Sequence, residues 1–397
     1  MKLKPFIPII VSLVLFGIFV MLPASWFTGL INSKTLATQR VALTDQVLKG
    51  TLIQDKMYQS NAYYPIYGSS ELEKDDPFNP AFLLNGRKDV PKQPFLIGTG
   101  GSTDLVNAVE LGSQYENLRG KKMAFIVSPQ WFTKHGLTHD NFKARISKGQ
   151  LNRLFNQNQL SPKLKQRYAK RLLQFKDVEN RPYLEKVAAG HMPKETQYLS
   201  KFQDNQLKKI EAIKSIYPLR TSPLSHIDPV THKNSSWHNI ESAAESYGEA
   251  RTKSNQFGIR DEYWGLIKQH KRKINRNYEF RQNSPEFNDL KLLVDTLREG
   301  GADVEYVILP SNGKWYDHIG IKQERRQKIY DKIDNTIIDH GGHTYNMTDK
   351  DYEPYVVSDA VHIGWKGWVD IAERIEQHMH KKITYKIKQS FQISQFM

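Results

Sequence analysis

Two serines and a distant aspartate–histidine pair are the residues of this sequence whose types and spacing could do chemistry. Ser69 and Ser70 follow Gly68 at the end of the apolar run "YPIYG". Asp359 and His362 lie three positions apart in "SDAVHIGWKGW". A serine hydroxyl becomes a nucleophile when an imidazole takes its proton and a carboxylate orients that imidazole. These residues therefore offer covalent acyl transfer, and a plain turn at the two serines is the alternative.

Five short apolar or β-branched runs predict the strands that would position these side chains. The runs cover residues 63–67, 95–97, 123–127, 304–309 and 343–347. Amphipathic segments such as "STDLVNAVELGSQYENL", "FNDLKLLVDTLREGG" and "GWVDIAERIEQHM" separate or follow them, which predicts an α/β fold with a three-layer parallel sheet. Ligands of such a sheet bind beyond the carboxyl ends of its strands. The two serines follow the first predicted strand and belong to that edge.

The chain divides into three parts by pattern. Residues 1–30 are predicted to be an N-terminal membrane anchor, 34–385 the α/β domain, and 386–397 a C-terminal tail. Between about 135 and 285 the pattern is helical and polar without a strong strand signal, which predicts a large helical insertion into the α/β domain.

The first residues predict one transmembrane helix. The segment from Phe6 to Leu22 is almost wholly apolar, and Lys2 and Lys4 precede it. This pattern favours a single-pass protein of the cell membrane, with a cytoplasmic N-terminus and an extracellular catalytic domain. A cleaved signal peptide is the competing interpretation, although the residues after Leu22 make poor small-x-small cleavage sites.

The charge balance favours an anionic partner. The chain has 57 Lys and Arg against 42 Asp and Glu, a net charge of +15, and no Cys, which excludes thiol catalysis and disulfides. Outside the membrane this balance favours an anionic wall polymer, with no nucleic acid, and ordinary surface solubility is the alternative. The stretch from Lys268 to Arg281 is the densest basic segment and could meet phosphates or form a solvated helix face.

The motifs together resemble a known family. A serine after the first strand, a glycine after the second, a polar amide after the third and D-x-x-H before the last helix resemble the SGNH (GDSL-like) hydrolases. More closely, "YPIYGSSEL", "GTGGSTD", "SPQWF", "PSNGKWYDHIG" and "SDAVHIGWKGW" resemble the DltD family of D-alanyl-lipoteichoic acid biosynthesis proteins, from end to end of the chain. That resemblance implies an SGNH-type sheet and a part in D-alanylation of teichoic acid in Gram-positive bacteria. It also implies a membrane-bound O-acyltransferase as partner and the teichoic acid polyanion as acceptor. We expect no cofactor and no metal.

The resemblance also implies roles for individual residues. Ser70 matches the family nucleophile, His362 the general base and acid, and Asp359 the orienting carboxylate. Gly100 or Gly101, in "GTGG", matches the glycine of the oxyanion hole, with the backbone N–H of Ser70 as second donor. "GTGG" also resembles a phosphate-cradling loop, but it lacks the lysine of a P-loop.

The sequence departs from the SGNH pattern in two places. Ser69 stands where the G-D-S motif has aspartate, and Gln130 stands where the third block has asparagine; Asn312 is the rival amide for the oxyanion hole. A D-alanyl group carries an ammonium, and Glu71 is a candidate carboxylate for it, with a solvent-facing glutamate in a first helical turn as the alternative.

Three functions follow for these residues. The leading one is an O-acyltransferase that passes D-alanine to teichoic acid through an ester on Ser70. An esterase or thioesterase would use the same side chains for hydrolysis. In a non-catalytic scaffold that binds teichoic acid, Ser70 would only cap a helix.

Overall fold

The computed structural model describes residues 6–74, 76–192, 198–216, 235–269 and 274–382. Five strands of these residues form a fully parallel sheet in the order β2-β1-β3-β4-β5. Each strand overlaps one of the predicted runs, so the prediction of an α/β fold with a parallel sheet is confirmed. The strands are β1 Tyr63–Gly68, β2 Gln93–Gly98, β3 Lys122–Val127, β4 Asp303–Ile308 and β5 His343–Asn346.

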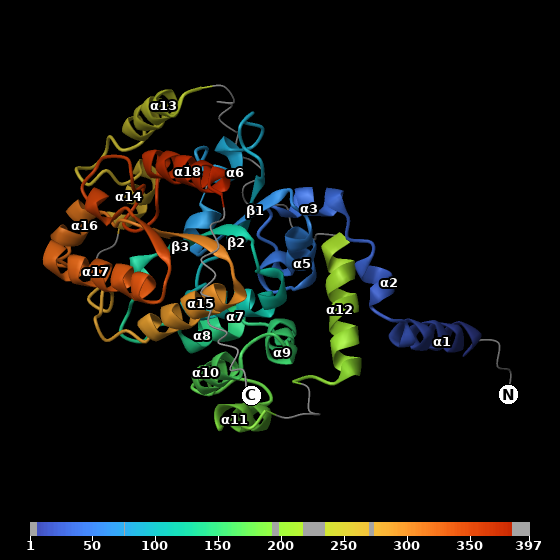
Figure 1. Cartoon of the computed structure of the whole chain (residues 1–397). Coiled ribbons are helices and arrows are strands. Elements are labelled where there is room, and N and C mark those ends of the chain that lie inside the picture. Colours follow the sequence, from blue (N-terminus) through green and yellow to red (C-terminus); the bar gives the residue numbers. More distant parts are fainter. Residues whose placement is uncertain (1–5, 75, 193–197, 217–234, 270–273, 383–397) are drawn as a thin grey trace, which may run out of the picture.

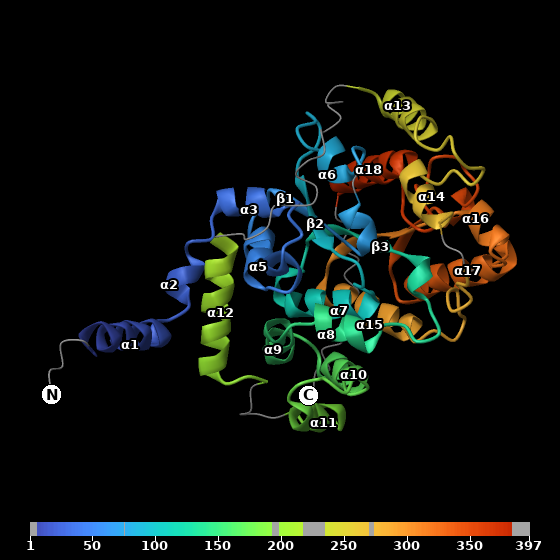
Figure 2. The same ribbon diagram turned by 180° about the vertical axis from the view of Figure 1, so that it is seen from behind.

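Helices cover both faces of the sheet (Figures 1 and 2). Side chains alternate along a strand, and in β1 Tyr63 and Tyr67 pack into one buried cluster while Tyr64 and Ile66 pack into another. The first cluster contains side chains of α7, α15 and α17, and the second contains side chains of α6, α13 and α18. The bounds of these helices are α6 Pro80–Leu83, α7 Asp104–Ser113, α13 Trp237–Glu249, α15 Glu286–Gly300, α17 Gln323–Asp339 and α18 Trp365–His380.

The described part of residues 135–285, the predicted helical insertion, contains helices and loops but no strand. Tyr168 of α10 joins this part to helices on the sheet: its hydroxyl donates to Ala108 O of α7 at 2.7 Å and lies 2.8 Å from the hydroxyl of Thr296 on α15. Besides α13, these helices are α8 His139–Arg145, α9 Lys148–Asn156, α10 Pro162–Leu172, α11 Arg181–Ala188, α12 Lys201–Ile216 and α14 Asp261–Ile267.

The remaining described elements are α1 and a set of shorter helices and turns. They are α1 Ile7–Met21, α2 Ser25–Thr28, α3 Ser33–Gln39, α4 Asp45–Leu48, α5 Leu52–Gln59, α16 Gly313–His318, and the 3₁₀ turns η2 Ser70–Glu73, η3 Tyr115–Asn117, η4 Pro129–Trp131 and η6 Thr348–Lys350. The predicted C-terminal tail lies outside the described residues.

The prediction of an N-terminal transmembrane helix is wrong. Helix α1 has 15 residues, about 22 Å at ~1.5 Å per residue, against a hydrocarbon core of ~30 Å. It ends at Met21 because Leu22 is extended and precedes Pro23, and a residue before proline disfavours the helical conformation. Of the helices in the described ranges, none combines the length and the apolar character needed to cross a membrane.

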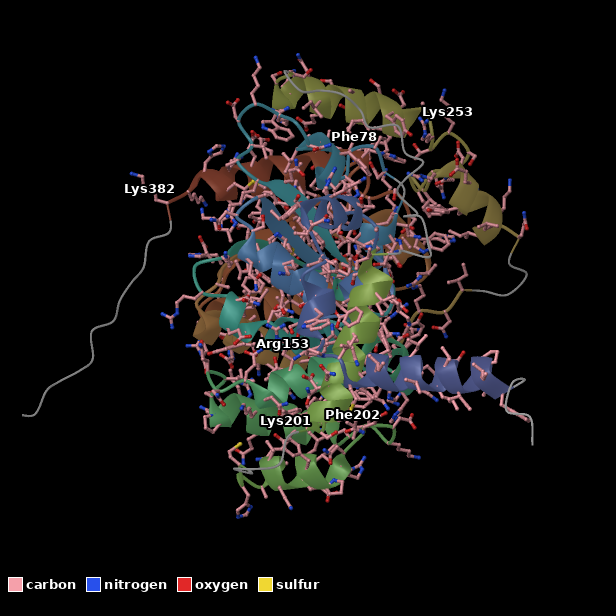
Figure 3. The ribbon with its side chains drawn as sticks, turned by 90° about the vertical axis from the view of Figure 1, so that its right-hand side faces the viewer. Phe78, Arg153, Lys201, Phe202, Lys253 and Lys382 are labelled. Atoms are coloured by element: carbon pink, nitrogen blue, oxygen red, sulfur yellow. The ribbon has the colours of Figure 1, made fainter. Side chains whose placement is uncertain are left out.

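Helix α1 projects from the body, and its C-terminal end lies against α12, the helix that carries Lys201 and Phe202 (Figure 3). Lys209 of α12 donates to the carbonyls of Phe19 and Val20 at 2.8 Å, and the Asn205 amide accepts from Ala24 N at 2.7 Å. Side chains of α12 therefore hold the N-terminal segment.

Two glycines close the carboxyl end of the β1–β2 pair. Gly68 and Gly98 are paired in register, and a Cβ on Gly98 would lie 2.6 Å from the carbonyl carbon of Gly68. The two strand ends can therefore approach because Gly98 carries no side chain. This close approach brings the loops that follow β1 and β2 together.

Asp76, in the loop after η2, gives a prediction for the pH dependence of stability. The residue is 1% exposed, Oδ1 accepts from Phe78 N at 2.9 Å, and Oδ2 has no partner in the described part of the chain. Burial raises the pKa of Asp76 from 3.8 to about 7, against the lowering charges of Arg260 and Arg251. Since the folded chain holds this proton more tightly, the unfolding free energy should fall as pH rises from ~4 to ~7, by a few kcal/mol at most.

Asp76→Asn should remove the contribution of Asp76 to the decrease in unfolding free energy between pH ~4 and ~7. Urea unfolding of wild type and variant across this pH range measures it, with the exposed Asp177→Asn as the matched control. Parallel curves for wild type and Asp76→Asn would contradict the assignment.

Candidate functional site

Ser70, His362 and Asp359 lie in one hydrogen-bonded row, although Ser70 and His362 are 292 residues apart in sequence. Ser70 Oγ is 2.9 Å from His362 Nε2, and His362 Nδ1 is 2.7 Å from Asp359 Oδ2. Ser70 begins η2 directly after β1, and the other two residues lie in the loop before α18. These distances are those of a nucleophile, a base and the carboxylate that orients the base.

The loop that carries Asp359 and His362 is braced by its own backbone. Asp359 Oδ1 accepts from the N–H groups of Val361 at 2.8 Å and His362 at 2.9 Å. Val357 and Ile363 form an antiparallel bridge across the base of the loop. The D-x-x-H spacing therefore folds into a turn in which one carboxylate oxygen holds the backbone and the other holds the ring.

The electrostatics keep Asp359 ionised. Burial alone would raise its pKa, but the charge of His362, the hydrogen bond from its ring and the two backbone donors lower the pKa to about 2. An ionised carboxylate accepts a hydrogen bond from Nδ1–H, so it selects the tautomer in which Nε2 presents a lone pair to Ser70 Oγ.

The structure separates the two serines. Ser69 is 2% exposed; its hydroxyl accepts from Trp131 Nε1 at 3.0 Å and lies 3.4 Å from Thr99 O as a donor. Ser70 is the serine whose hydroxyl meets the imidazole. The position of Ser69 matches a supporting role, in which its side chain joins the loops after β2 and β3.

Glu71 is buried, so the alternative of a solvent-facing glutamate is wrong. The side chain is 1% exposed, with Oε1 accepting from Ser69 N at 2.5 Å and Oε2 from Ser128 Oγ at 3.1 Å. Burial raises the pKa of Glu71, and these hydrogen bonds together with His362 oppose the rise. Its carboxylate ties the end of β1 to the end of β3, and a Cβ on Gly68 would collide with it.

The predicted oxyanion glycines differ in their surroundings. A Cβ on Gly100 would lie 3.8 Å from Ser70 Cβ, so Gly100 borders the nucleophile, but its N–H donates to Glu73 Oε2 at 2.6 Å. Gly101 has a φ of +83° and faces the amide of Asn141. Left-handed backbone of this kind favours glycine.

The two amides proposed for the third block also differ. Gln130 is buried in η4, and its amide makes no hydrogen bond to another described residue. The Nδ2 group of Asn312 donates to Phe257 O at 2.9 Å and to Asp359 O at 3.2 Å, while Oδ1 caps α16. Both N–H bonds of Asn312 are used, so this amide supports the Asp359 loop and leaves Gln130 as the amide with a free donor.

Glu73 is a site residue that sequence reasoning missed. Its carboxylate accepts from the hydroxyl of Thr99 and from Gly100 N, beside Ser70. Side chains three residues apart in a 3₁₀ helix lie on the same side, so "SELE" from Ser70 to Glu73 contained the signal once the turn type was known. Within the described ranges no group of three His, Asp or Glu side chains could hold a metal.

The site lies where the strand order changes direction. From β1 the chain continues to β2 on one side and later to β3 on the other, and in open parallel sheets ligands bind at the carboxyl ends of the strands at such a switch point. Ser70 follows β1, Gly100 follows β2 and Gln130 follows β3. Fold and row together define an α/β protein with a hydrogen-bonded serine, histidine and aspartate at the carboxyl edge of its parallel sheet.

Comparison with known proteins gives the family. A family model described as "DltD protein" matches residues 40–380. The Protein DltD of Staphylococcus aureus (strain NCTC 8325 / PS 47) is 61% identical over 381 residues, which cover 96% of this chain and 97% of that protein. The Protein DltD of Bacillus subtilis (strain 168) is 33% identical over 392 residues, covering 95% and 97%. That of Lacticaseibacillus rhamnosus is 24% identical over 401 residues, covering 97% and 93%.

The chain belongs to the DltD family, and the resemblance predicted from its motifs is confirmed. DltD proteins take part in the D-alanylation of teichoic acids.

Proposed function

We propose that the protein is a serine acyltransferase that passes D-alanine to teichoic acid through an ester on Ser70, at the outer face of the cell. The observation that carries this proposal is the 2.9 Å contact between Ser70 Oγ and His362 Nε2, backed by Asp359. A membrane-bound O-acyltransferase is the proposed source of the D-alanyl group.

The geometry supports two half-reactions. In the first, Ser70 Oγ attacks the acyl carbon as its proton passes to His362 Nε2; the bond from that carbon to the leaving group breaks, and the leaving group takes the proton from Nε2. In the second, a teichoic acid hydroxyl gives its proton to Nε2 and attacks the ester carbon. Ser70 Oγ then leaves and regains the proton.

The negative oxygen of each tetrahedral intermediate needs hydrogen-bond donors. The proposed donors are the backbone N–H of Ser70, one of Gly100 and Gly101, and the amide of Gln130. Since Gly100 N–H donates to Glu73 Oε2 in the structure, it serves an oxyanion only when Glu73 moves. A cationic substrate group that attracts the Glu73 carboxylate would free this donor.

Glu73 replaces Glu71 as our candidate for the ammonium of the D-alanyl group. Both oxygens of Glu71 bind the protein, and the residue is buried. Glu73 is half-buried, forms no salt bridge with a described residue, and its Oε2 would lie 3.3 Å from a Cβ on Gly100. A carboxylate beside Gly100 and Ser70 can hold a cation that water no longer solvates.

Glu73→Gln should therefore change acyl specificity. We expect acylation of Ser70 by a D-alanyl donor to fall about 10- to 100-fold, the loss typical of one hydrogen bond to a charged group. Acylation by a propionyl donor with the same leaving group should change by less than about threefold. Rates come from intact-mass measurements, with the exposed Glu245→Gln as control. An equal loss with both donors would refute the role in ammonium recognition.

The proposed function itself is tested by intact mass after exposure to a D-alanyl donor or a serine-reactive fluorophosphonate. The wild type should gain one acyl or phosphonyl group, and a purified teichoic acid should remove the alanyl group by accepting it. Release of free D-alanine at the same rate with and without the acceptor would assign hydrolysis instead. An unmodified wild-type protein would refute the covalent mechanism.

A further inference from the structure

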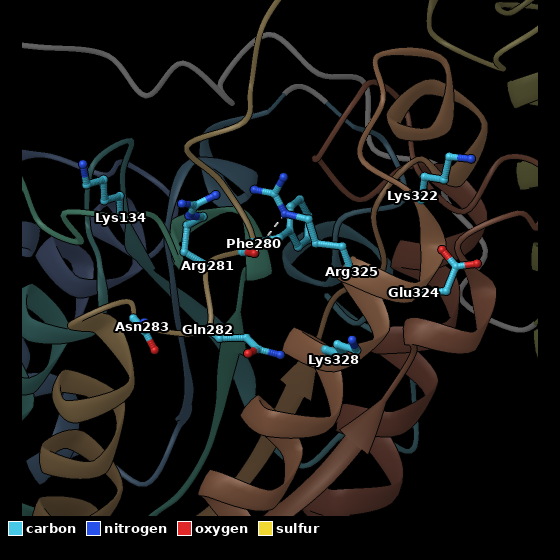
Figure 4. A pocket seen from close by; sticks show the side chains of 9 residues that line it. All are labelled: Lys134, Phe280, Arg281, Gln282, Asn283, Lys322, Glu324, Arg325 and Lys328. Atoms are coloured by element: carbon cyan, nitrogen blue, oxygen red, sulfur yellow. Dashed lines mark hydrogen bonds between the residues drawn. The ribbon is translucent and has the colours of Figure 1, made fainter.

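Away from Ser70, a cavity of about 690 Å³ is lined by basic side chains of three separate segments (Figure 4). Lys134 and Arg281 come from the loops next to η4 and α15, and Lys322, Arg325 and Lys328 come from the start of α17. Glu324 is the carboxylate among its described lining residues. Five positive charges against one negative charge favour an anionic occupant.

These positive charges are only partly balanced by nearby carboxylates. None of the five cations forms a salt bridge with a described residue, whereas nearby Arg276 pairs with Glu279 at 2.5 Å. The pKa of Arg325 is lowered by burial and then by the charge of Arg281, while the charge of Glu279 opposes this decrease. Arg281 and Arg325 therefore repel each other, and an anion bound between them would reduce this repulsion.

Part of the cavity is held in position before any ligand arrives. Arg325 Nε donates to Phe280 O at 3.2 Å, and another of its N–H groups donates to Asn277 O at 2.8 Å. Such fixed guanidinium groups lose little entropy when they bind an anion.

The N-terminus of α17 adds to the positive potential. This helix has 17 residues, begins at Gln323 and has no side-chain cap at Lys322. Lys322, Glu324 and Arg325 of its first turn line the cavity. The positive end of the helix dipole, with uncapped backbone N–H groups, therefore lies at the cavity, as at many phosphate sites.

One segment connects the cavity with the loop that carries Ser70. Arg281 N donates to Phe132 O at 2.8 Å, and Lys134 N donates to Tyr278 O at 3.0 Å. The same segment contains Trp131, whose Nε1 donates to Oγ of Ser69, the residue before the nucleophile. This connection is the basis for relating the cavity to the Ser70 site.

We propose that this cavity is a phosphate-binding subsite that holds phosphodiester groups of the acceptor polymer while another unit of the polymer reaches Ser70. The proposal rests on the proposed function and names where its acceptor binds. The size of the cavity and its spread of cations suit a repeating anion. The lining aromatic residue, Phe280, is 1% exposed, so the cavity offers no surface for stacking of nucleic-acid bases.

The test compares two triple variants of the full chain that remove the same charge. In the cavity variant, Lys134, Arg281 and Lys328 become glutamine; in the control variant, the exposed Lys163, Lys170 and Lys186 of α10 and α11 become glutamine. Both carry Ser70→Ala, so that binding is measured without acyl transfer. Arg325 is left intact because it holds neighbouring carbonyls.

Affinity for a purified teichoic acid is measured by calorimetry from ~50 to ~200 mM salt. We expect the cavity variant to bind at least about tenfold more weakly and with a smaller salt slope, because bound phosphates release counterions. The control variant should bind within about twofold of the Ser70→Ala protein. Equal losses in both triples, or no loss in either, would overturn the proposal.

Two further ligands identify the source of the phosphate. Inorganic phosphate should compete with the polymer only at millimolar concentration, because it fills one position of several. Vesicles of phosphatidylglycerol should bind both triples equally. Vesicle binding lost only in the cavity variant would assign the cavity to lipid headgroups and overturn the polymer assignment.

The subsite and the proposed function can be refuted separately by these experiments. If the cavity binds the polymer but Ser70 is never acylated, the phosphate-binding subsite stands and the transferase proposal is refuted. If Ser70 is acylated but the cavity variant binds the polymer as well as the control does, the transferase proposal stands and the subsite is refuted.

Discussion

Replacing Ser70 by alanine should abolish covalent acylation and reduce D-alanine transfer by about 10⁴- to 10⁶-fold, because the nucleophile of a covalent mechanism has no substitute. Ser70 lies at the start of η2 and is half-buried, so loss of its hydroxyl removes the contact to His362 with little effect on packing. Intact mass after treatment with a donor measures the acylation. D-alanine bound to teichoic acid in cells that produce the variant measures the transfer.

Ser69→Ala is the matched control. Its hydroxyl accepts from Trp131 and does not meet the imidazole, so we expect less than about a tenfold decrease and a normal mass shift on Ser70. Full D-alanylation with Ser70→Ala at normal protein level would contradict the enzyme and favour a scaffold. If Ser69→Ala loses the mass shift and Ser70→Ala keeps it, then Ser69 is the nucleophile and Ser70 is not.

Asp359→Asn should be the second large effect. The amide keeps Oδ1 as acceptor for the N–H groups of Val361 and His362, so the loop should retain its turn. In the wild type, Oδ2 of Asp359 accepts a hydrogen bond from His362 Nδ1. In the variant, an NH₂ group takes the place of this oxygen and can only donate. The imidazole then prefers the tautomer with its proton on Nε2, which cannot take a proton from Ser70. We expect acylation to slow by about 10³- to 10⁴-fold.

The pH profile separates this effect from misfolding. Because the pKa of Asp359 is about 2, its carboxylate is ionised throughout the working range, and the wild-type rate should show no loss from this group above pH ~4. The exposed Asp349→Asn serves as control for the substitution. Wild-type rates in Asp359→Asn would mean that His362 needs no orienting carboxylate.

Strands β1 to β4 were predictable because they are buried on both faces and read as short apolar runs, whereas β5 is partly exposed. The run 304–309, for example, predicts β4 Asp303–Ile308 within one residue at each end. The order of the strands in the sheet was not predictable from the sequence, since it depends on which strand edges pair in space. The N-terminal helix was overestimated because the apolar run continues past Met21, while the proline after Leu22 ends the helix.

The site was predictable only in part. A D-x-x-H pair before a helix and a serine after a strand are local patterns, and the structure places them in one row. The surroundings depend on tertiary contacts: the amide of Asn312 is consumed by Phe257 O and Asp359 O, and Glu71 is buried between strand ends. Glu73 was missed because its role follows from a 3₁₀ turn that residue types alone do not specify.

The wide separation of Ser70 and His362 in sequence has a consequence during biosynthesis. A chain still being made contains the hydroxyl long before the ribosome has added the imidazole. Throughout that interval the hydroxyl lacks its base, so the nascent chain should be inert toward activated acyl groups. Under the proposed function, we expect reactivity only after His362 has been added and its loop, before α18, has packed against Ser70.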